Sequence, residues 1–411
     1  MKIVESPYIY IDGRYERGLA LLFGEEILDI ATPSELKRLH PDIPTISMRG
    51  NGILFPGFVN PHVHLEFSAN RSILRYGDFI DWLYSVIECR DILFRKGDED
   101  TMRRACEEML SSGITTFGAI SSNGKDLGVC RETVQKVIYF NEAIGSSAEY
   151  AETIFEALVQ RVHESRKDAK RYSLTPAVAI HSPYSVHPSL LEKAVGLARE
   201  EGMPLTAHFM ESSYEREWLD TGRGGFAPFF EKFFGRDEPT MGAEEFLEKF
   251  DGYPTLFVHC THASDTELER MKRGGDYIAH CPRSNRLLGC GRLEIENIEV
   301  PITLATDGYS SNYSLNIFDE MRSALMMHCD IDPLSLADRL IASITATGAK
   351  SVGSDAGRIE IGAPADMVFV ELPEECDDTE RLSLDTILHT KEVSKIWIDG
   401  EEIALPVGEV H

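Results

Sequence analysis

The sequence predicts an α/β protein: a (β/α)8 TIM barrel carrying a small β-sandwich domain made from both termini. The first reason is length, because 411 residues accommodate a barrel of about 250 residues and one smaller unit. The second is a long middle region in which strand-like and helix-like segments alternate. The third is a strand-and-turn texture that occurs at both ends of the chain.

The middle region contains short apolar runs that read as strands. They are GILFPGFVN, ITTFGAI, YSLTPAVAIH, MPLTAHF, TLFVHCTH, YIAHCP and ITLATDG. Helix-compatible segments follow them, among them DFIDWLYSVIECRDIL, RETVQKVIYFNEAI and PSLLEKAVGLAREEG. Repeated β–α units require a parallel sheet, and their number suits a closed barrel better than an open sheet.

Both ends of the chain alternate apolar and polar residues between glycine-bearing turns. Examples are KIVES, YIYIDG and LALLFGEEILDIA near the start, and GRIEIGAPADMVFVELP near the end. We therefore expect residues 1–53 and 353–411 to form one composite β domain, and residues 54–352 to form the barrel.

Charge and cysteine usage narrow the classes of partner and compartment. The formal net charge of −27 argues against binding to a phosphate backbone, so we expect no nucleic acid partner. Eight cysteines without a CxxC pair, and a first segment MKIVESPYIYIDG without a signal-peptide pattern, favour the reducing cytoplasm. No apolar stretch is long enough to span a membrane, so no membrane partner is expected.

Nearly every strand-like run in the middle ends on a side chain that can bind a metal or move a proton. In a (β/α)8 barrel these ends converge on one mouth. The side chains are His62, His64, His181, His208, His259, His280 and Asp307. A lone buried histidine is usually a hydrogen-bonded core residue, but six at successive strand ends make that interpretation poor. Imidazole and carboxylate are natural ligands of zinc, and a catalytic zinc keeps one position open for water.

Glu211 follows His208 by three residues, in the segment HFME. A carboxyl just past the fifth strand is close enough to carry protons beside a ligand, which hydrolysis at a metal requires. The alternative is an ordinary helix N-terminal charge. The neighbouring candidate ligands favour the proton carrier.

Six segments together resemble the amidohydrolase superfamily, in its branch of purine, S-adenosylhomocysteine and cytosine deaminases and s-triazine hydrolases. The segments are PHVHLE, AHFME, VHCTH, AHCPRSN, TDGYSSNYSLNIFDEMR and GRIEIGAPADMVFVEL. The resemblance covers essentially the whole chain.

The resemblance implies one metal ion per chain, Zn2+ with Fe2+ as the alternative. Its ligands would be His62, His64, His208 and Asp307. Glu211 would be the proton shuttle, and His259 would orient the attacking water and, with Asp307, help to remove its proton. Relatives with two metals use a carboxylated lysine at the fourth strand, but TPAVAIHSPYS has no lysine, so a single metal is expected.

Other candidate ligands rank lower. His262 is not expected to act, because some relatives resemble VHCTH only at its first histidine. Cys260, Cys281 and Cys290 are expected to be packed thiols, since none belongs to a CxxC pair.

The implied activity is hydrolytic deamination of the 6-aminopurine of a nucleoside by a metal-activated water, which releases ammonia and leaves a lactam. HSPYSVHP, with His181 and Ser182, and the helix that contains Glu88 resemble segments that hold the purine and ribose. IGSSAEYAETIFEAL resembles aminodeoxyfutalosine deaminases, which act in the futalosine route to menaquinone, so Ser146 or Ser147 is expected at the substrate.

Aminodeoxyfutalosine ranks ahead of S-adenosylhomocysteine, because the arginines that hold the homocysteine carboxylate have no clear match around IGSSAEYAE. Its benzoate would meet Arg90, Arg283 or Arg286. Glu88 could equally be a solvated residue on a helix face. Adenosine, methylthioadenosine and S-adenosylhomocysteine deaminases, an s-triazine chlorohydrolase and a non-catalytic metal-binding scaffold stay as alternatives. A homo-oligomer is compatible with the sequence but not specified by it.

Overall fold

The structure, a computed structural model, describes residues 1–48, 50–70, 72–167 and 169–406. The chain divides into two compact units. One comprises Met1–Asn60, Cys106–Phe117 and the chain from Asn316 onward, and the other comprises Pro61–Ala105 and Gly118–Leu315. Each unit is considered by itself below.

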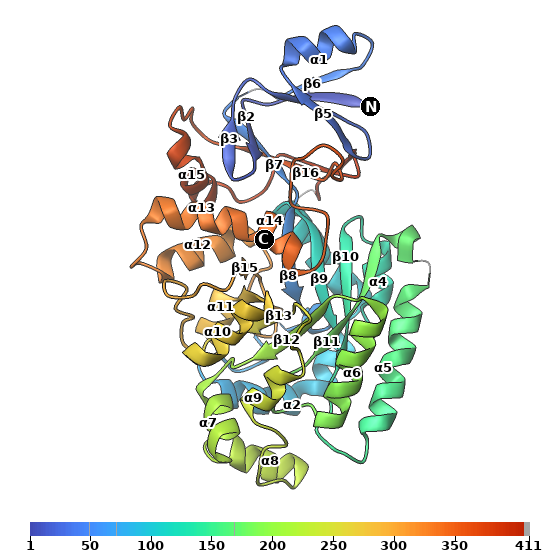
Figure 1. The fold of residues 1–411 in the computed structure, drawn as a ribbon, viewed down its shortest axis with the longest axis vertical. Coiled ribbons are helices and arrows are strands. Elements are labelled where there is room, and N and C mark those ends of the chain that lie inside the picture. Colours follow the sequence, from blue (N-terminus) through green and yellow to red (C-terminus); the bar gives the residue numbers. More distant parts are fainter. Residues whose placement is uncertain (49, 71, 168, 407–411) are drawn as a thin grey trace. The chain divides into compact units, whose positions relative to one another are not determined.

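Eight strands form one sheet in sequence order, which is the order of a (β/α)8 barrel (Figure 1). These strands are β8 (Phe58–Val63), β9 (Ile114–Ser121), β10 (Lys136–Ala143), β11 (Leu174–Ile180), β12 (Leu205–Phe209), β13 (Leu256–His259), β14 (Tyr277–His280) and β15 (Ile302–Leu304). Neighbours from β10 to β15 pair in parallel. The predicted barrel is confirmed.

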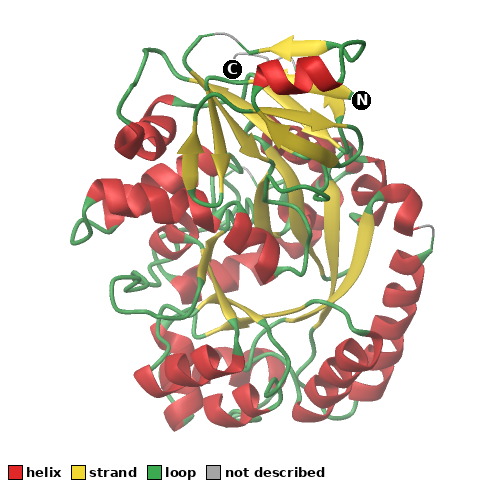
Figure 2. Cartoon of the chain, turned by 45° about the horizontal axis from the view of Figure 1, so that its top comes forward, coloured by secondary structure: helices red, strands yellow, loops and turns green. Residues whose placement is uncertain are grey.

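The barrel strands are buried on both faces, which explains their continuous apolar sequences. All residues of β8, β9, β12 and β13 are buried. Strands of parallel sheets covered by helices lack the alternation of half-exposed strands for this reason. Helices lie outside the strands (Figure 2), and α5 and α6 pack against β10 and β11.

The helices of the described residues run between and after these strands. They are α1 (Pro33–Leu39), α2 (Phe79–Lys96), α3 (Glu99–Ser111), α4 (Leu127–Glu132), α5 (Ala151–Arg166), α6 (Pro188–Glu201), α7 (Ser213–Thr221), α8 (Phe226–Phe234), α9 (Ala243–Glu248), α10 (Asp265–Gly274), α11 (Pro282–Leu287), α12 (Ile317–Met327), α13 (Pro333–Ser343), α14 (Ala346–Ser351) and α15 (Leu382–His389), with short 3-10 turns η1 (Leu65–Phe67), η2 (Ala169–Tyr172) and η3 (Thr379–Arg381). Within the described part of the chain, none of them has the length and apolar character needed to cross a membrane.

The prediction of a helical segment at RETVQKVIYFNEAI is wrong. Its first residues end the short helix α4, and its remainder is β10, the third barrel strand. The run KVIYFNEA is almost fully buried in the sheet, so it shows no period-two alternation that would separate it from a buried helix. The error matters because β10 carries a buried carboxyl, Glu142, at its end.

The predicted first strand GILFPGFVN is two strands in the structure. β7 (Gly52–Pro56) belongs to a different sheet from β8, and Gly57 separates them. A Cβ atom at Gly57 would overlap the side chain of Thr115, so the break requires a residue without a side chain. The chain changes sheets at this glycine.

The terminal strands form two sheets that pack as a small sandwich. The strands are β1 (Lys2–Glu5), β2 (Tyr8–Ile11), β3 (Arg14–Glu16), β4 (Ala20–Phe23), β5 (Ile27–Ala31), β6 (Thr45–Ser47), β16 (Met367–Glu371), β17 (Lys395–Ile398) and β18 (Glu401–Ile403), together with β7. The sheet orders are β5-β4-β1-β6 and β18-β17-β16-β7-β2-β3. Strand β16 from the C-terminal region pairs antiparallel with β7 from the N-terminal region (Figure 1).

Both sheets contribute to one apolar core, which includes Val4, Phe23, Leu54, Met367 and Trp397. The predicted β-sandwich made from both termini is therefore confirmed as a fold class. The domain limits 1–53 with 353–411, and 54–352, remain predictions. These ranges include residues 49, 71, 168 and 407–411, which lie outside the described residues.

Candidate metal centre and active site

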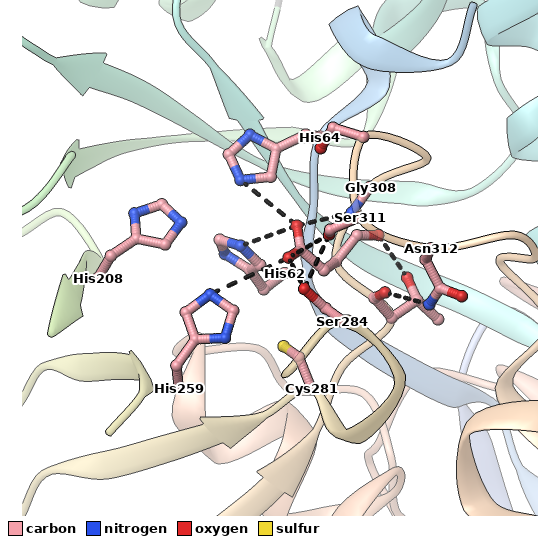
Figure 3. Close-up of polar contacts among 12 residues, drawn as sticks. His62, His64, His208, His259, Cys281, Ser284, Gly308, Ser311 and Asn312 are labelled. Carbon is pink, nitrogen blue, oxygen red and sulfur yellow. Dashed lines mark hydrogen bonds and ion pairs between the residues drawn. The ribbon is translucent and has the colours of Figure 1, made fainter. Parts of the chain in front are cut away.

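The ends of four barrel strands bring together five of the side chains that the sequence singled out. His62 is in β8 and His64 follows it, His208 is in β12, His259 is the last residue of β13, and Asp307 lies just beyond β15. The ligand atoms of His62, His64 and His208 lie within 4.8 Å of one another, and so do those of His62, His259 and Asp307. Figure 3 shows the four histidine rings gathered at one place.

The carboxylate of Asp307 is the meeting point of the cluster. Its Oδ1 lies 3.8 Å from His62 Nε2 and 3.7 Å from His64 Nε2, and its Oδ2 lies 4.0 Å from His259 Nε2. The hydroxyls of Ser284 and Ser311 each donate a hydrogen bond to Oδ2 at 2.8 Å.

The backbone around Asp307 is shaped to hold this carboxylate. The N–H of Gly308 donates to Oδ1 at 2.7 Å, and a Cβ atom at Gly308 would lie only 2.8 Å from His64 Cβ. Asp307 has a φ of 55° and His259 a φ of 69°. Left-handed backbone at residues other than glycine costs energy and persists where the surrounding structure enforces it, commonly at functional sites.

The groups that face Asp307 favour its ionised form. Burial would raise the pKa of Asp307, but His64, His62 and His259, with the hydroxyl of Ser284, outweigh it and hold that pKa below the usual range. Burial and the neighbouring ring of His64 hold the pKa of His62 well below its usual value. Burial, followed by the ring of His62, does the same for His208. Neutral rings keep the nitrogen lone pairs that a metal needs.

Two of the histidines have their outer nitrogen paired with an acceptor. His208 Nδ1 lies 2.6 Å from the carbonyl oxygen of His181, and His259 Nδ1 lies 2.8 Å from Asn285 Oδ1. Each contact assigns the ring proton to Nδ1 and leaves Nε2 unprotonated. For His259, that Nε2 is the atom that faces Asp307. Metal-ligating histidines are oriented in this way by an acceptor on the other nitrogen.

Zinc-type chemistry fits the unmatched polar atoms of the cluster. Both ring nitrogens of His62 are buried, and within the described part of the chain neither has a hydrogen-bond partner. Buried polar atoms without partners are costly. A cation between His62, His64, His208 and Asp307 would relieve this cost at Nε2 of His62, the nitrogen on the side of Asp307, and three imidazoles with one carboxylate suit zinc.

Glu211 lies beside the cluster. Its side chain is buried, and Oε1 is 3.5 Å from His259 Nε2. Burial, followed by the charges of Asp307 and Glu215, raises the pKa of Glu211 well above its usual value. Because burial lowers the pKa of His259, this contact is not an ion pair near neutral pH. Glu215 accepts the backbone N–H groups of Met210 and Glu211, which fixes the turn after β12.

Of the predicted substrate residues, two are near the histidines. The ring of His181 lies 5.4 Å from that of His208 between centroids, and its Nδ1 contacts Ser185 Oγ at 2.6 Å and Ser182 Oγ at 3.1 Å. Burial lowers the pKa of His181 to about 4, so the ring is neutral. Ser182 is buried beside it.

The other predicted substrate residues are not drawn into the cluster. Glu88 is on α2 with about half of its side chain exposed, and it pairs with Arg75 at 3.1 Å. Ser146 lies between β10 and α5 and is half-buried, whereas Ser147 is exposed. Their contact with substrate remains a prediction.

The three arginines proposed to bind the benzoate differ in their exposure to solvent. Arg90 and Arg286 are exposed. Arg283 is buried, donates to the carbonyl of Ser314 at 2.9 Å and stacks on the ring of Tyr313.

The lower-ranked ligands stay outside the metal-capable groups. Among the described residues, the groups of side chains that could hold a metal contain no cysteine. Cys260, Cys281 and Cys290 are buried. His262 Nε2 is engaged with the carbonyl of Cys290 at 2.7 Å.

Sequence reasoning did not assign roles to Ser284, Asn285 and Ser311. Ser284 and Asn285 belong to AHCPRSN, and Ser311 belongs to TDGYSSN. The signal available was their position, since each lies a few residues past a barrel strand end where side chains reach the mouth.

The family profile described as "Amidohydrolase family" matches residues 53–403. With eight barrel strands in sequence order and a histidine–aspartate cluster at their ends, the chain belongs to the amidohydrolase family, and it is an enzyme of the metal-dependent hydrolase class.

Particular relatives are similar over nearly the full chain. An aminodeoxyfutalosine deaminase of Nitratiruptor sp. is 43% identical, over 98% of this chain and 99% of the relative. A protein of Helicobacter pylori named adenosine deaminase is 31% identical, over 93% and 94%. The crystal structure of Helicobacter pylori aminofutalosine deaminase in complex with methylthio-coformycin has a TM-score of 0.93 and 29% identity, covering 98% of this chain and 100% of that one.

We predict that His62→Ala loses the metal and the activity together. The ring has no hydrogen-bond partner in the described part of the chain, so binding the metal is its expected role. Loss of a residue that only hydrogen-bonds to a ligand weakens metal binding by up to about 100-fold, and loss of the ligand itself should weaken it more. Metal content per chain after dialysis, by elemental analysis, is the measurement. His262→Ala is the matched control and should keep its metal. Full occupancy in His62→Ala would refute the ligand assignment.

Proposed function

We propose that this enzyme deaminates the 6-aminopurine of a nucleoside by hydrolysis, and that aminodeoxyfutalosine is its substrate. The observation that carries the chemistry is the placement of two buried carboxyls around one ring. His259 Nε2 lies 3.5 Å from Glu211 Oε1 and 4.0 Å from Asp307 Oδ2. One centre thus holds a group to accept a proton and a second group to return one, as replacing an amine by water requires.

In this proposal His62, His64, His208 and Asp307 hold one zinc ion. When bound, the ion supplies a Lewis-acid centre that makes a nucleophile from water at neutral pH. Asp307 and His259 accept the proton of the attacking water. Glu211 donates its proton to the ring nitrogen next to the reacting carbon. It then regains a proton that comes from the attacking water and passes it to the departing amine, which leaves as ammonia. Its burial shields this exchange from bulk water.

The substrate assignment is supported by full-length similarity to the Nitratiruptor aminodeoxyfutalosine deaminase and by the fold shared with the Helicobacter aminofutalosine deaminase. It would place the enzyme in the futalosine route to menaquinone, in the cytoplasm. Adenosine is the second candidate, because the similar Helicobacter pylori protein is named an adenosine deaminase.

We predict that aminodeoxyfutalosine is deaminated with the highest kcat/KM in a panel that also contains adenosine, methylthioadenosine, S-adenosylhomocysteine and an s-triazine. Each reaction is followed by ultraviolet absorbance and by released ammonia, with chloride release for the chlorinated triazine. A higher kcat/KM for adenosine would move the assignment to the second candidate. Metal content without ammonia release from any nucleoside would favour the non-catalytic scaffold.

We predict that Glu211→Gln retains the metal but loses turnover by about 10²–10⁴-fold, the usual worth of positioned proton transfer. The amide keeps the shape of the side chain but cannot donate a carboxyl proton to the leaving amine. Single-turnover rates at saturating substrate, with metal content measured on the same sample, provide the readout. Glu217→Gln, on the exposed face of α7, is the control. Near wild-type turnover in Glu211→Gln would exclude the shuttle role.

A further inference from the structure

The outer nitrogens of the clustered histidines differ in one respect. His208 and His259 each have an acceptor at Nδ1, a carbonyl oxygen and an amide oxygen respectively. His64 has Nε2 on the side of Asp307, at 3.7 Å, so its Nδ1 is the outer nitrogen. That Nδ1 is buried and has no hydrogen-bond partner within the described part of the chain. A ligand histidine is normally oriented through this atom.

A buried carboxyl with a spare oxygen ends the third barrel strand. Glu142 is the penultimate residue of β10 and is 1% exposed. Its Oε2 accepts a hydrogen bond from the hydroxyl of Ser122. Its Oε1 is buried and, among the described residues, has no hydrogen-bond partner. An acceptor and a potential donor are thus both left unmatched in the interior.

The pKa of Glu142 responds to the ring of His64. Burial raises the pKa of Glu142, and the ring of His64 is the strongest influence that lowers it, ahead of the hydrogen bond from Ser122. The deamination scheme gives Glu142 no role.

The loop after β9 holds this carboxyl in place. Glu66, two residues after His64, accepts the backbone N–H groups of Ser122, Asn123 and Lys125 at 3.0, 3.1 and 2.9 Å. The segment that carries His64 is therefore fastened to the loop that carries Ser122, and Ser122 in turn anchors Glu142. Arg161 also donates to the backbone carbonyl of Glu142. Glu142 is thus linked, through the loop of residues 122–125 and Glu66, to the segment that carries His64.

We propose that Glu142 is a positioning residue of the metal centre: its Oε1 accepts the Nδ1–H of His64, directly or through one bridging water, and so directs the unprotonated Nε2 toward the metal. A water that bridges the two atoms would satisfy both of them. The negative charge also makes the ring a stronger donor to a cation. This inference rests on the proposed metal site but not on the identity of the substrate.

The test is the zinc affinity of Glu142→Gln and Glu142→Ala, measured by competition with a chromophoric chelator. Both variants should bind zinc about 10–100-fold more weakly than the wild type, the usual cost of losing such a contact, with the larger loss in the alanine variant. Asp276→Asn is the matched control. This substitution neutralises another buried carboxyl, which accepts the N–H of Thr255. Thr255 directly precedes β13 and Asp276 directly precedes β14, so both lie at the strand ends opposite to the histidines. The variant should therefore leave zinc affinity unchanged.

The thermal midpoint of each metal-free variant separates positioning from folding. The proposal requires weakened zinc binding in Glu142→Gln while its metal-free midpoint falls no further than that of Asp276→Asn. The proposal is overturned if Glu142→Gln binds zinc as tightly as the wild type. It is also overturned if Asp276→Asn loses as much zinc affinity as Glu142→Gln. If Glu142→Gln fails to fold, a crystal structure of the zinc-loaded wild type decides. In that structure His64 Nδ1 should donate to Glu142 or to a water bound to Glu142. Any other acceptor at His64 Nδ1 refutes the proposal. Because zinc affinity needs no substrate, failure of the deaminase assignment gives a different result from failure here.

Discussion

The buried carboxylate of Asp307 organises the whole centre. An isolated buried carboxylate is expensive, yet this one is held ionised by two serine hydroxyls, the N–H of Gly308 and three facing histidine rings. Burial lowers the pKa of His62 and the pKa of His259. One buried carboxylate among imidazole rings is a set of ligands that suits a cation, and the local backbone, with a φ of 55° at Asp307, holds the carboxylate in place.

Much of this centre could be predicted from the sequence because the barrel converts sequence position into spatial position. His62, His64, His208, His259 and Asp307 each follow or end an apolar run, and the ends of all such runs meet at one mouth. Position and side-chain type also singled out His181 and His280, and the resemblance to the amidohydrolase superfamily selected the ligands among these residues. The same reasoning reached Glu211, which lies in the turn directly after β12.

The parts that could not be predicted have physical causes. The segment of β10 was interpreted as helical, since a strand buried on both faces loses the alternation that identifies strands. Glu142 was consequently not placed at the mouth, where the structure has it. Ser284, Asn285 and Ser311 act through hydrogen bonds that depend on loop geometry rather than on periodicity. Glu88 illustrates the same limit for the substrate, because helix amphipathicity does not distinguish a solvated face from a ligand-binding one.

The central claim is that the charge of Asp307 serves the metal rather than the fold, and a thermal comparison of the wild type with Asp307→Asn tests it most directly. Both proteins are unfolded by heat, once without zinc and once with a zinc concentration that saturates the wild type. Because a ligand that binds only the folded state stabilises it, zinc should raise the midpoint of the wild type. In Asp307→Asn the metal-free midpoint should be preserved, and zinc should have little effect. An equal rise in both proteins, or a metal-free variant that no longer folds, would contradict this account.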